Sequence, residues 1–208
     1  MICGACRGSA VNLRKLFMAP YTSNDMTIPN SLSLLRIALI PCFVVLFYLP
    51  GVWSNIAAAA VFAFAALTDW LDGYLARKLN QMSAFGAFLD PVADKLMVAA
   101  ALILLLQLGR VDAIVALIII GREIAISALR EWMAGAGRGN NVAVSLIGKI
   151  KTASQMIAIL LLLYYEPISG ISTQEIGTWL IWLAALMTVV SMIYYVVQAY
   201  KSTRKPRN

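Results

Sequence analysis

The chain has 208 residues, of which 61% are hydrophobic and 13% are charged. Charged residues make up about 25% of an average soluble domain, so this composition excludes an ordinary soluble globular protein and favours a polytopic membrane protein. The net charge is +7 and the chain contains no histidine. Because histidine is the commonest general base and metal ligand, any such chemistry must rest on carboxylates, lysine, tyrosine or cysteine.

The N-terminal 25 residues are polar and show no periodic pattern. They lack the apolar core of a signal peptide. We interpret residues 1–25 as an N-terminal extension, either disordered or upstream of a true start at Met26, and residues 26–208 as a single membrane domain. Cys3 and Cys6 have a C-x-x-C spacing that could bind a metal or form a disulfide, but no second pair completes a zinc site.

Six apolar stretches follow, each close to the roughly 20 residues that a membrane-spanning helix needs. They cover approximately residues 31–50, 54–79, 86–108, 112–134, 146–165 and 176–199. The sequence therefore predicts an all-α fold, a polytopic membrane protein with six transmembrane helices.

Lysine and arginine gather on one side of these spans. They are frequent in the N-terminal segment, in the loops after the second and fourth spans, and in the C-terminal tail, whereas the opposite side carries only Arg110. The positive-inside rule then places both termini in the cytoplasm. Basic ends in these positions would attract anionic lipids, which favours a membrane surface over nucleic acid as the partner of the positive charge.

A cluster of aspartates interrupts the apolar pattern where the second span ends and the third begins. Asp69 and Asp72 are three residues apart, and Asp90 and Asp94 are four apart, so each pair projects from one face of its helix. A carboxylate in a membrane helix costs about 2.5–3.5 kcal/mol, which argues against a purely structural role. A short turn around 80–85 would make the two helices antiparallel neighbours, with four carboxylates converging on one cytoplasm-facing cavity.

Ligation by oxygen alone suits Mg²⁺ or Mn²⁺. Four carboxylates can hold a pair of such ions, an arrangement well suited to phosphoryl transfer. Gly73 and Ala76, which follow Asp72, would open space for a bulky ligand on the helix surface. Arg77 could contact a diphosphate.

Four cations occupy the fourth span and the start of the fifth: Arg122, Arg130, Lys149 and Lys151. Arginines inside a membrane are costly unless they are paired or functional. Two interpretations stay open. Glu123 and Glu131 could pair with the arginines, or the cations could form a basic pocket for the phosphate of an incoming acceptor.

The run from Asp69 to Asp94 reads D-x-x-D-G-x-x-A-R-x(8)-G-x-x-x-D-x-x-x-D. It resembles the signature of the CDP-alcohol phosphatidyltransferases. This resemblance implies a six-helix membrane protein, usually a homodimer, with its site open to the cytoplasm. For a bacterial member, it implies the inner (cytoplasmic) membrane.

The resemblance also implies roles for individual residues. Asp69, Asp72 and Asp90 match the positions that bind the metal ions, and Asp94 matches the proposed general base and a further metal ligand. The positions that match contacts to the CDP part of the donor are Asp69, Gly73, Ala76 and Arg77.

Further stretches, at 28–37, 122–131 and 148–152, resemble those family members that use glycerol 3-phosphate. The implied reaction transfers the phosphatidyl group of CDP-diacylglycerol to glycerol 3-phosphate and gives phosphatidylglycerophosphate and CMP, a step of phospholipid biosynthesis. The alternative within the family is another acceptor alcohol, as in cardiolipin or phosphatidylinositol-phosphate synthesis.

Two other classes fit the sequence less well. A membrane prenyltransferase would carry two separated aspartate-rich motifs, whereas this chain has one compound motif. A divalent-cation transporter would place acidic residues along a path across the bilayer, and here they lie towards one side.

Overall fold

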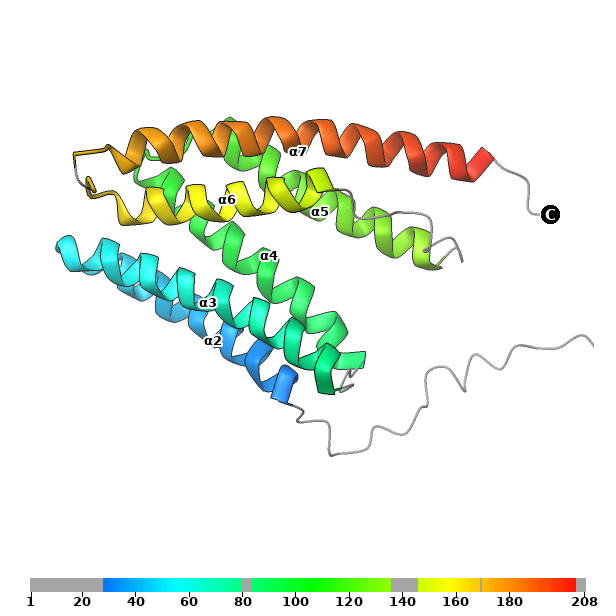
Figure 1. Cartoon of the computed structure of the whole chain (residues 1–208), viewed down its shortest axis with the longest axis horizontal. Helices are drawn as coiled ribbons and strands as arrows, with labels where there is room; N and C mark the ends of the chain where they lie inside the picture. The colour runs from blue at the N-terminus through cyan, green and yellow to red at the C-terminus, as the bar shows by residue number, and fades with distance from the viewer. Residues whose placement is uncertain (1–27, 80–83, 136–145, 169, 205–208) are drawn as a thin grey trace, which may run out of the picture.

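The computed structural model describes residues 28–79, 84–135, 146–168 and 170–204. These residues form six α-helices without a strand, so the all-α class is confirmed for the part of the chain described (Figure 1). The helices are α2 (Ile28–Phe47), α3 (Val52–Leu79), α4 (Ala84–Gln107), α5 (Ala113–Gly135), α6 (Leu146–Tyr164) and α7 (Thr173–Arg204). Some helical side chains lie outside the description, namely those of residues 28–30, 52, 70, 72–79, 84–88, 130, 134–135, 146–149 and 198–204.

Each predicted apolar span corresponds to one helix, and local signals fix several ends. Gly109 follows α4 with a φ of 67°, a conformation that favours glycine after a helix. Asp112 caps α5, because its Oδ1 accepts a hydrogen bond of 2.7 Å from the backbone N–H of Ile114. At the other end of the chain, α7 continues beyond the predicted limit of residue 199 and ends at Arg204, so it includes part of the basic tail.

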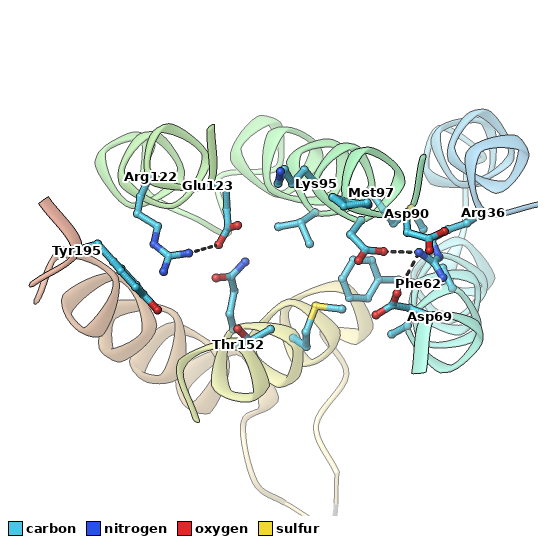
Figure 2. Close-up of a pocket in the computed structure, with 17 residues that line it drawn as sticks. Arg36, Phe62, Asp69, Asp90, Lys95, Met97, Arg122, Glu123, Thr152 and Tyr195 are labelled. Atoms are coloured by element: carbon cyan, nitrogen blue, oxygen red, sulfur yellow. Dashed lines mark hydrogen bonds and ion pairs between the residues drawn. The ribbon is translucent and has the colours of Figure 1, made fainter. Parts of the chain in front are cut away.

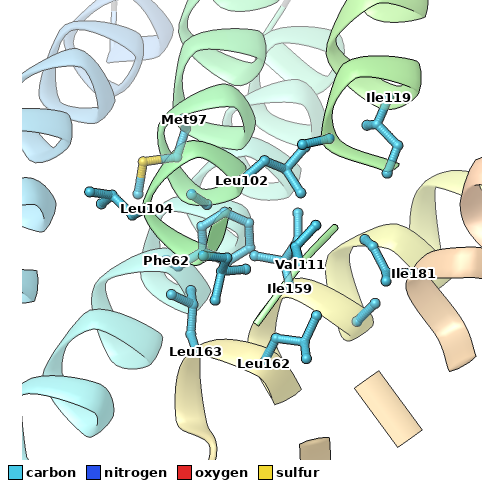
Figure 3. Close-up of a cluster of buried hydrophobic side chains, with 14 of the residues drawn as sticks. Phe62, Met97, Leu102, Leu104, Val111, Ile119, Ile159, Leu162, Leu163 and Ile181 are labelled. Atoms are coloured by element: carbon cyan, nitrogen blue, oxygen red, sulfur yellow. The ribbon is translucent and has the colours of Figure 1, made fainter. Parts of the chain in front are cut away.

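The packing of α2, α3 and α4 differs from the expected arrangement. The sequence predicts that α3 and α4, joined by a short turn around 80–85, are antiparallel neighbours. Instead they contact each other at few positions, whereas α2 packs extensively against both. In Figure 1 α4 diverges from α3 beyond their joined ends. The core formed around α3, α4 and α6 includes Phe62, Leu105 and Ile159, all buried (Figure 3).

The end of the molecule away from the aspartates is held by Arg110, the one cation predicted on the outer side. Its Nη1 donates to the backbone carbonyls of Leu162 (3.0 Å) and Leu163 (3.2 Å), near the C-terminus of α6. Its Nη2 donates to Oδ1 of Asn55 on α3 at 3.1 Å, and the guanidinium lies 3.8 Å from the ring centroid of Tyr165. A cation at a helix C-terminus is favourable, so Arg110 links the α4–α5 connection to two other helices.

Among the described residues, one helical segment, Thr173–Val197, is long and apolar enough to cross a membrane by length and composition. Three further apolar segments are shorter: Ser31–Phe47, Trp53–Asp69 and Ile150–Tyr164. Large apolar side chains are nevertheless exposed on every helix, and Trp53 and Trp179 are 80% and 78% exposed. Exposed apolar surface of this extent is typical of contact with a membrane or a partner.

A test of the packing follows from Gly177, where α7 approaches α6 closely. A Cβ added at Gly177 would lie 2.8 Å from Cγ of Leu162. Overpacking of this kind costs roughly 1–3 kcal/mol, so we expect Gly177→Ala to lower the melting temperature in detergent micelles by about 2–12 °C. Gly121→Ala is the matched control, because nothing lies within 4 Å of an added Cβ there and alanine favours the helix. Equal melting temperatures for the two variants would contradict this packing.

Candidate active site

Three of the predicted aspartates line one cavity of about 420 Å³. Asp69 comes from α3, and Asp90 and Asp94 lie one helical turn apart on α4. The cavity is in the size range of small-molecule sites. Figure 2 shows Asp69 and Asp90 at one end of it, beside Arg36. The convergence of these three residues on one cavity agrees with the prediction from their spacing.

The acidic end is held together by α2. Arg36 is only 1% exposed, and its Nη1 lies 3.1 Å from Oδ1 of Asp69 and also contacts Oδ1 of Asp94. One turn earlier, Ser33 donates a hydrogen bond to Oδ1 of Asp90. A buried guanidinium between carboxylates offsets their mutual repulsion and their desolvation. Side chains of α2 therefore link Asp69 of α3 to Asp90 and Asp94 of α4.

The opposite end of the cavity is basic. Oε1 of Glu123 accepts from Nη1 of Arg122 at 2.9 Å and from Nζ of Lys151 at 2.7 Å. Nη2 of Arg122 lies 3.4 Å from Oγ of Ser191 on α7. Lys151 is 1% exposed, so this three-residue cluster joins α5 to α6 inside the protein. The pairing that the sequence left open is thus formed between Glu123 and Arg122, and Glu123 also binds a second cation.

The cavity consequently has two ends of opposite character. Figure 2 places Asp69, Asp90 and Arg36 at one end and Arg122 and Glu123 at the other. The first end carries more carboxylates than cations and suits bound cations. At the second end Arg122 and Glu123 line the cavity and Lys151 lies behind Glu123, so the cluster has a net positive charge and suits an anion. A ligand that combines a cation-bound diphosphate with a separate phosphate would match both ends.

Several predicted site residues fall outside the described side chains: Asp72, Gly73, Ala76, Arg77, Arg130 and Lys149. Among the side chains that the structure does describe, no three carboxylates or cysteines come close enough to hold a metal ion. The predicted ligand set includes Asp72, so the metal site stays a prediction.

Sequence reasoning did not assign three polar residues of the cavity region, Arg36, Ser33 and Gln155, to the site. The sequence position of Arg36 indicates a buried partner, because a cation inside an apolar stretch is costly unless it is paired. From the sequence alone it is included only among the basic residues on the predicted cytoplasmic side. Glu123 was considered only as a partner of arginine. Ser33 and Gln155 are single polar residues in apolar helices and gave a weaker signal.

Comparisons with known proteins identify the family. Residues 26–190, which include the aspartate run, match the family model described as CDP-alcohol phosphatidyltransferase. The chain is 50% identical over 185 residues to the CDP-diacylglycerol–glycerol-3-phosphate 3-phosphatidyltransferase of Pectobacterium atrosepticum, across 88% of this chain and 100% of that protein. Proteins of the same name from Shigella flexneri and Escherichia coli K12 are 49% identical over 177 residues, across 84% of this chain and 96% of each relative. This chain therefore belongs to the CDP-alcohol phosphatidyltransferase family.

Proposed function

We propose that this protein transfers the phosphatidyl group of CDP-diacylglycerol to glycerol 3-phosphate, giving phosphatidylglycerophosphate and CMP. The observation that carries the proposal is the two-ended cavity, with Asp69, Asp90 and Asp94 at one end and a basic cluster at the other. Relatives about half identical over most of the chain carry the name of this reaction. The protein is accordingly a transferase of phospholipid biosynthesis.

The metal ions of this reaction would be held by Asp69, Asp72, Asp90 and Asp94. Carboxylate oxygens are the donors that Mg²⁺ and Mn²⁺ prefer. The buried guanidinium of Arg36, which contacts both Asp69 and Asp94, marks a position where these carboxylates stabilise positive charge. When bound, a pair of divalent ions would neutralise the charge of the donor diphosphate and of the departing CMP.

Asp94 is the proposed general base. It removes the proton from the acceptor hydroxyl, whose oxygen attacks the β-phosphorus of the donor. The bond between that phosphorus and the oxygen of CMP breaks, so one P–O bond forms as another is lost. Arg36 contacts Oδ1 of Asp94 and thereby orients the carboxylate. At the end of α3, Gly73, Ala76 and Arg77 would contact the CDP part of the donor together with Asp69.

The basic end of the cavity is the proposed site for the acceptor phosphate. Arg122 lines the cavity and Lys151 is joined to it through Glu123. Arg130 and Lys149 belong to the same proposal on the basis of their sequence positions. A phosphorylated acceptor needs such cations, whereas an acceptor without phosphate, such as serine, does not.

The membrane arrangement that we propose has six helices spanning the bacterial inner membrane, with both termini and the active site on the cytoplasmic side. Its support is the asymmetric distribution of lysine and arginine and the exposed apolar side chains on every helix. A donor with acyl chains requires an enzyme at the bilayer. We also propose that the protein forms a homodimer and that its basic ends contact anionic lipids.

A first test concerns Asp94. We expect Asp94→Asn to reduce CMP release by about 10²–10⁴-fold, because asparagine cannot accept the hydroxyl proton. Asp112→Asn is the matched control: it makes the same change outside the cavity, and asparagine preserves the helix cap there. Near-normal turnover by Asp94→Asn in purified protein would rule out Asp94 as the base.

A second test identifies the acceptor. The purified enzyme is incubated with CDP-diacylglycerol and an equimolar mixture of glycerol 3-phosphate, inositol phosphate, phosphatidylglycerol and serine. Mass spectrometry of the lipids should detect phosphatidylglycerophosphate as the dominant product, because the basic end binds a small phosphorylated alcohol. Dominant formation of cardiolipin or phosphatidylinositol phosphate would instead support the alternative acceptor.

A third test removes the divalent ions. Complete chelation should abolish CMP release, and added Mg²⁺ or Mn²⁺ should restore it, because the carboxylates alone cannot neutralise a diphosphate. The melting temperature, measured in the same samples, separates loss of the ions from loss of the fold. Activity that survives complete chelation would contradict the metal site.

A further inference from the structure

Gln155 is a buried polar residue of the cavity to which the proposed reaction gives no role. It lies on α6, one helical turn after Lys151, and it lines the same cavity as Arg122 and Glu123. Its side chain is 3% exposed, and its Oε1 has no hydrogen-bond partner among the described residues. Because buried polar atoms in native proteins are nearly always paired, an unpaired acceptor that lines a cavity is available to a bound ligand.

A second unpaired atom lies in the same cavity. Nε of Arg122 has no partner, while its two terminal nitrogens contact Glu123 and Ser191. The two atoms have opposite requirements, since Nε–H needs an acceptor and Oε1 of Gln155 needs a donor. A phosphate dianion satisfies Arg122 but cannot donate to Gln155. A ligand that presents a hydroxyl close to its phosphate would satisfy both atoms.

We propose that Gln155 is a specificity residue that accepts a hydrogen bond from the C2 hydroxyl of glycerol 3-phosphate. This inference rests on the proposed function. In that acceptor the phosphate lies at one end and the reacting C1 hydroxyl at the other, and the C2 hydroxyl lies between them. With the phosphate at Arg122 and the C1 hydroxyl at Asp94, the remaining hydroxyl is the donor that Gln155 lacks.

The experiment compares glycerol 3-phosphate with 3-hydroxypropyl phosphate, which differs only by the absence of the C2 hydroxyl. For the wild-type enzyme we expect kcat/KM to be about 10- to 100-fold lower with the analogue, because the buried acceptor is then left unpaired. In Gln155→Met, an apolar side chain of similar length, the two substrates should agree within about 3-fold. The KM for CDP-diacylglycerol should not change.

Gln107→Met is the matched control. Gln107 lies at the far end of α4, where its Oε1 accepts from the hydroxyl of Tyr48 at 2.7 Å, so the same substitution there should leave the substrate ratio at its wild-type value. A general loss of stability would lower both rates together and leave their ratio unchanged. The ratio of the two kcat/KM values therefore distinguishes recognition of the C2 hydroxyl by Gln155 from a purely structural role of this residue.

A measurement on the wild-type enzyme covers the case in which Gln155→Met does not fold. The 2-fluoro analogue retains the size of the C2 substituent but cannot donate, so it should react as poorly as 3-hydroxypropyl phosphate. If either analogue matches glycerol 3-phosphate, or if Gln155→Met keeps the wild-type ratio, the inference is wrong while the proposed function stands. If the wild-type enzyme forms no product from glycerol 3-phosphate, both are overturned.

Discussion

The buried guanidinium of Arg36 is the interaction on which the acidic end of the cavity depends. Asp69 and Asp94 come from different helices, and both contact Arg36. Carboxylates gathered at one end of a cavity repel one another, and the buried guanidinium is a counter-charge that offsets this repulsion. This interaction agrees with the packing of α2 against both α3 and α4, while those two helices hardly touch. Helix α2 is thus part of the site as well as part of the bundle.

The rest of the bundle provides a rigid frame around this arrangement. Close approach of α6 and α7 at Gly177, and the contacts of Arg110 with α3 and α6, fix the end of the molecule away from the aspartates. Between the two ends, the buried apolar core holds the helices that carry the acidic and basic residues. The residues of the acidic end and Arg122 and Glu123 of the other end line the same cavity.

The sequence predicted the helices and the convergence of Asp69, Asp90 and Asp94 on one cavity, because both depend on local patterns. Apolar runs of about 20 residues define helices, and spacings of three or four residues place side chains on one face. The partner of those aspartates could not be found in this way. Arg36 lies more than thirty residues before Asp69, and only the packing of α2 across α3 and α4 brings them together. Likewise, Glu123 was expected to pair with a neighbouring arginine, but its contact with Lys151 depends on how α5 meets α6.

The carboxylate of Glu123, which accepts hydrogen bonds from both Arg122 and Lys151, has a consequence for the charge balance at the basic end of the cavity. Because the carboxylate of Glu123 bridges Arg122 and Lys151, the protein does not bury two isolated positive charges. The same bridge competes with every incoming anion. Inorganic phosphate interacts mainly through its charge. We therefore expect it to bind more weakly at this end than a larger phosphorylated molecule that makes additional contacts. If the basic end holds the acceptor phosphate as proposed, Glu123 favours acceptors that bind through more than their charge.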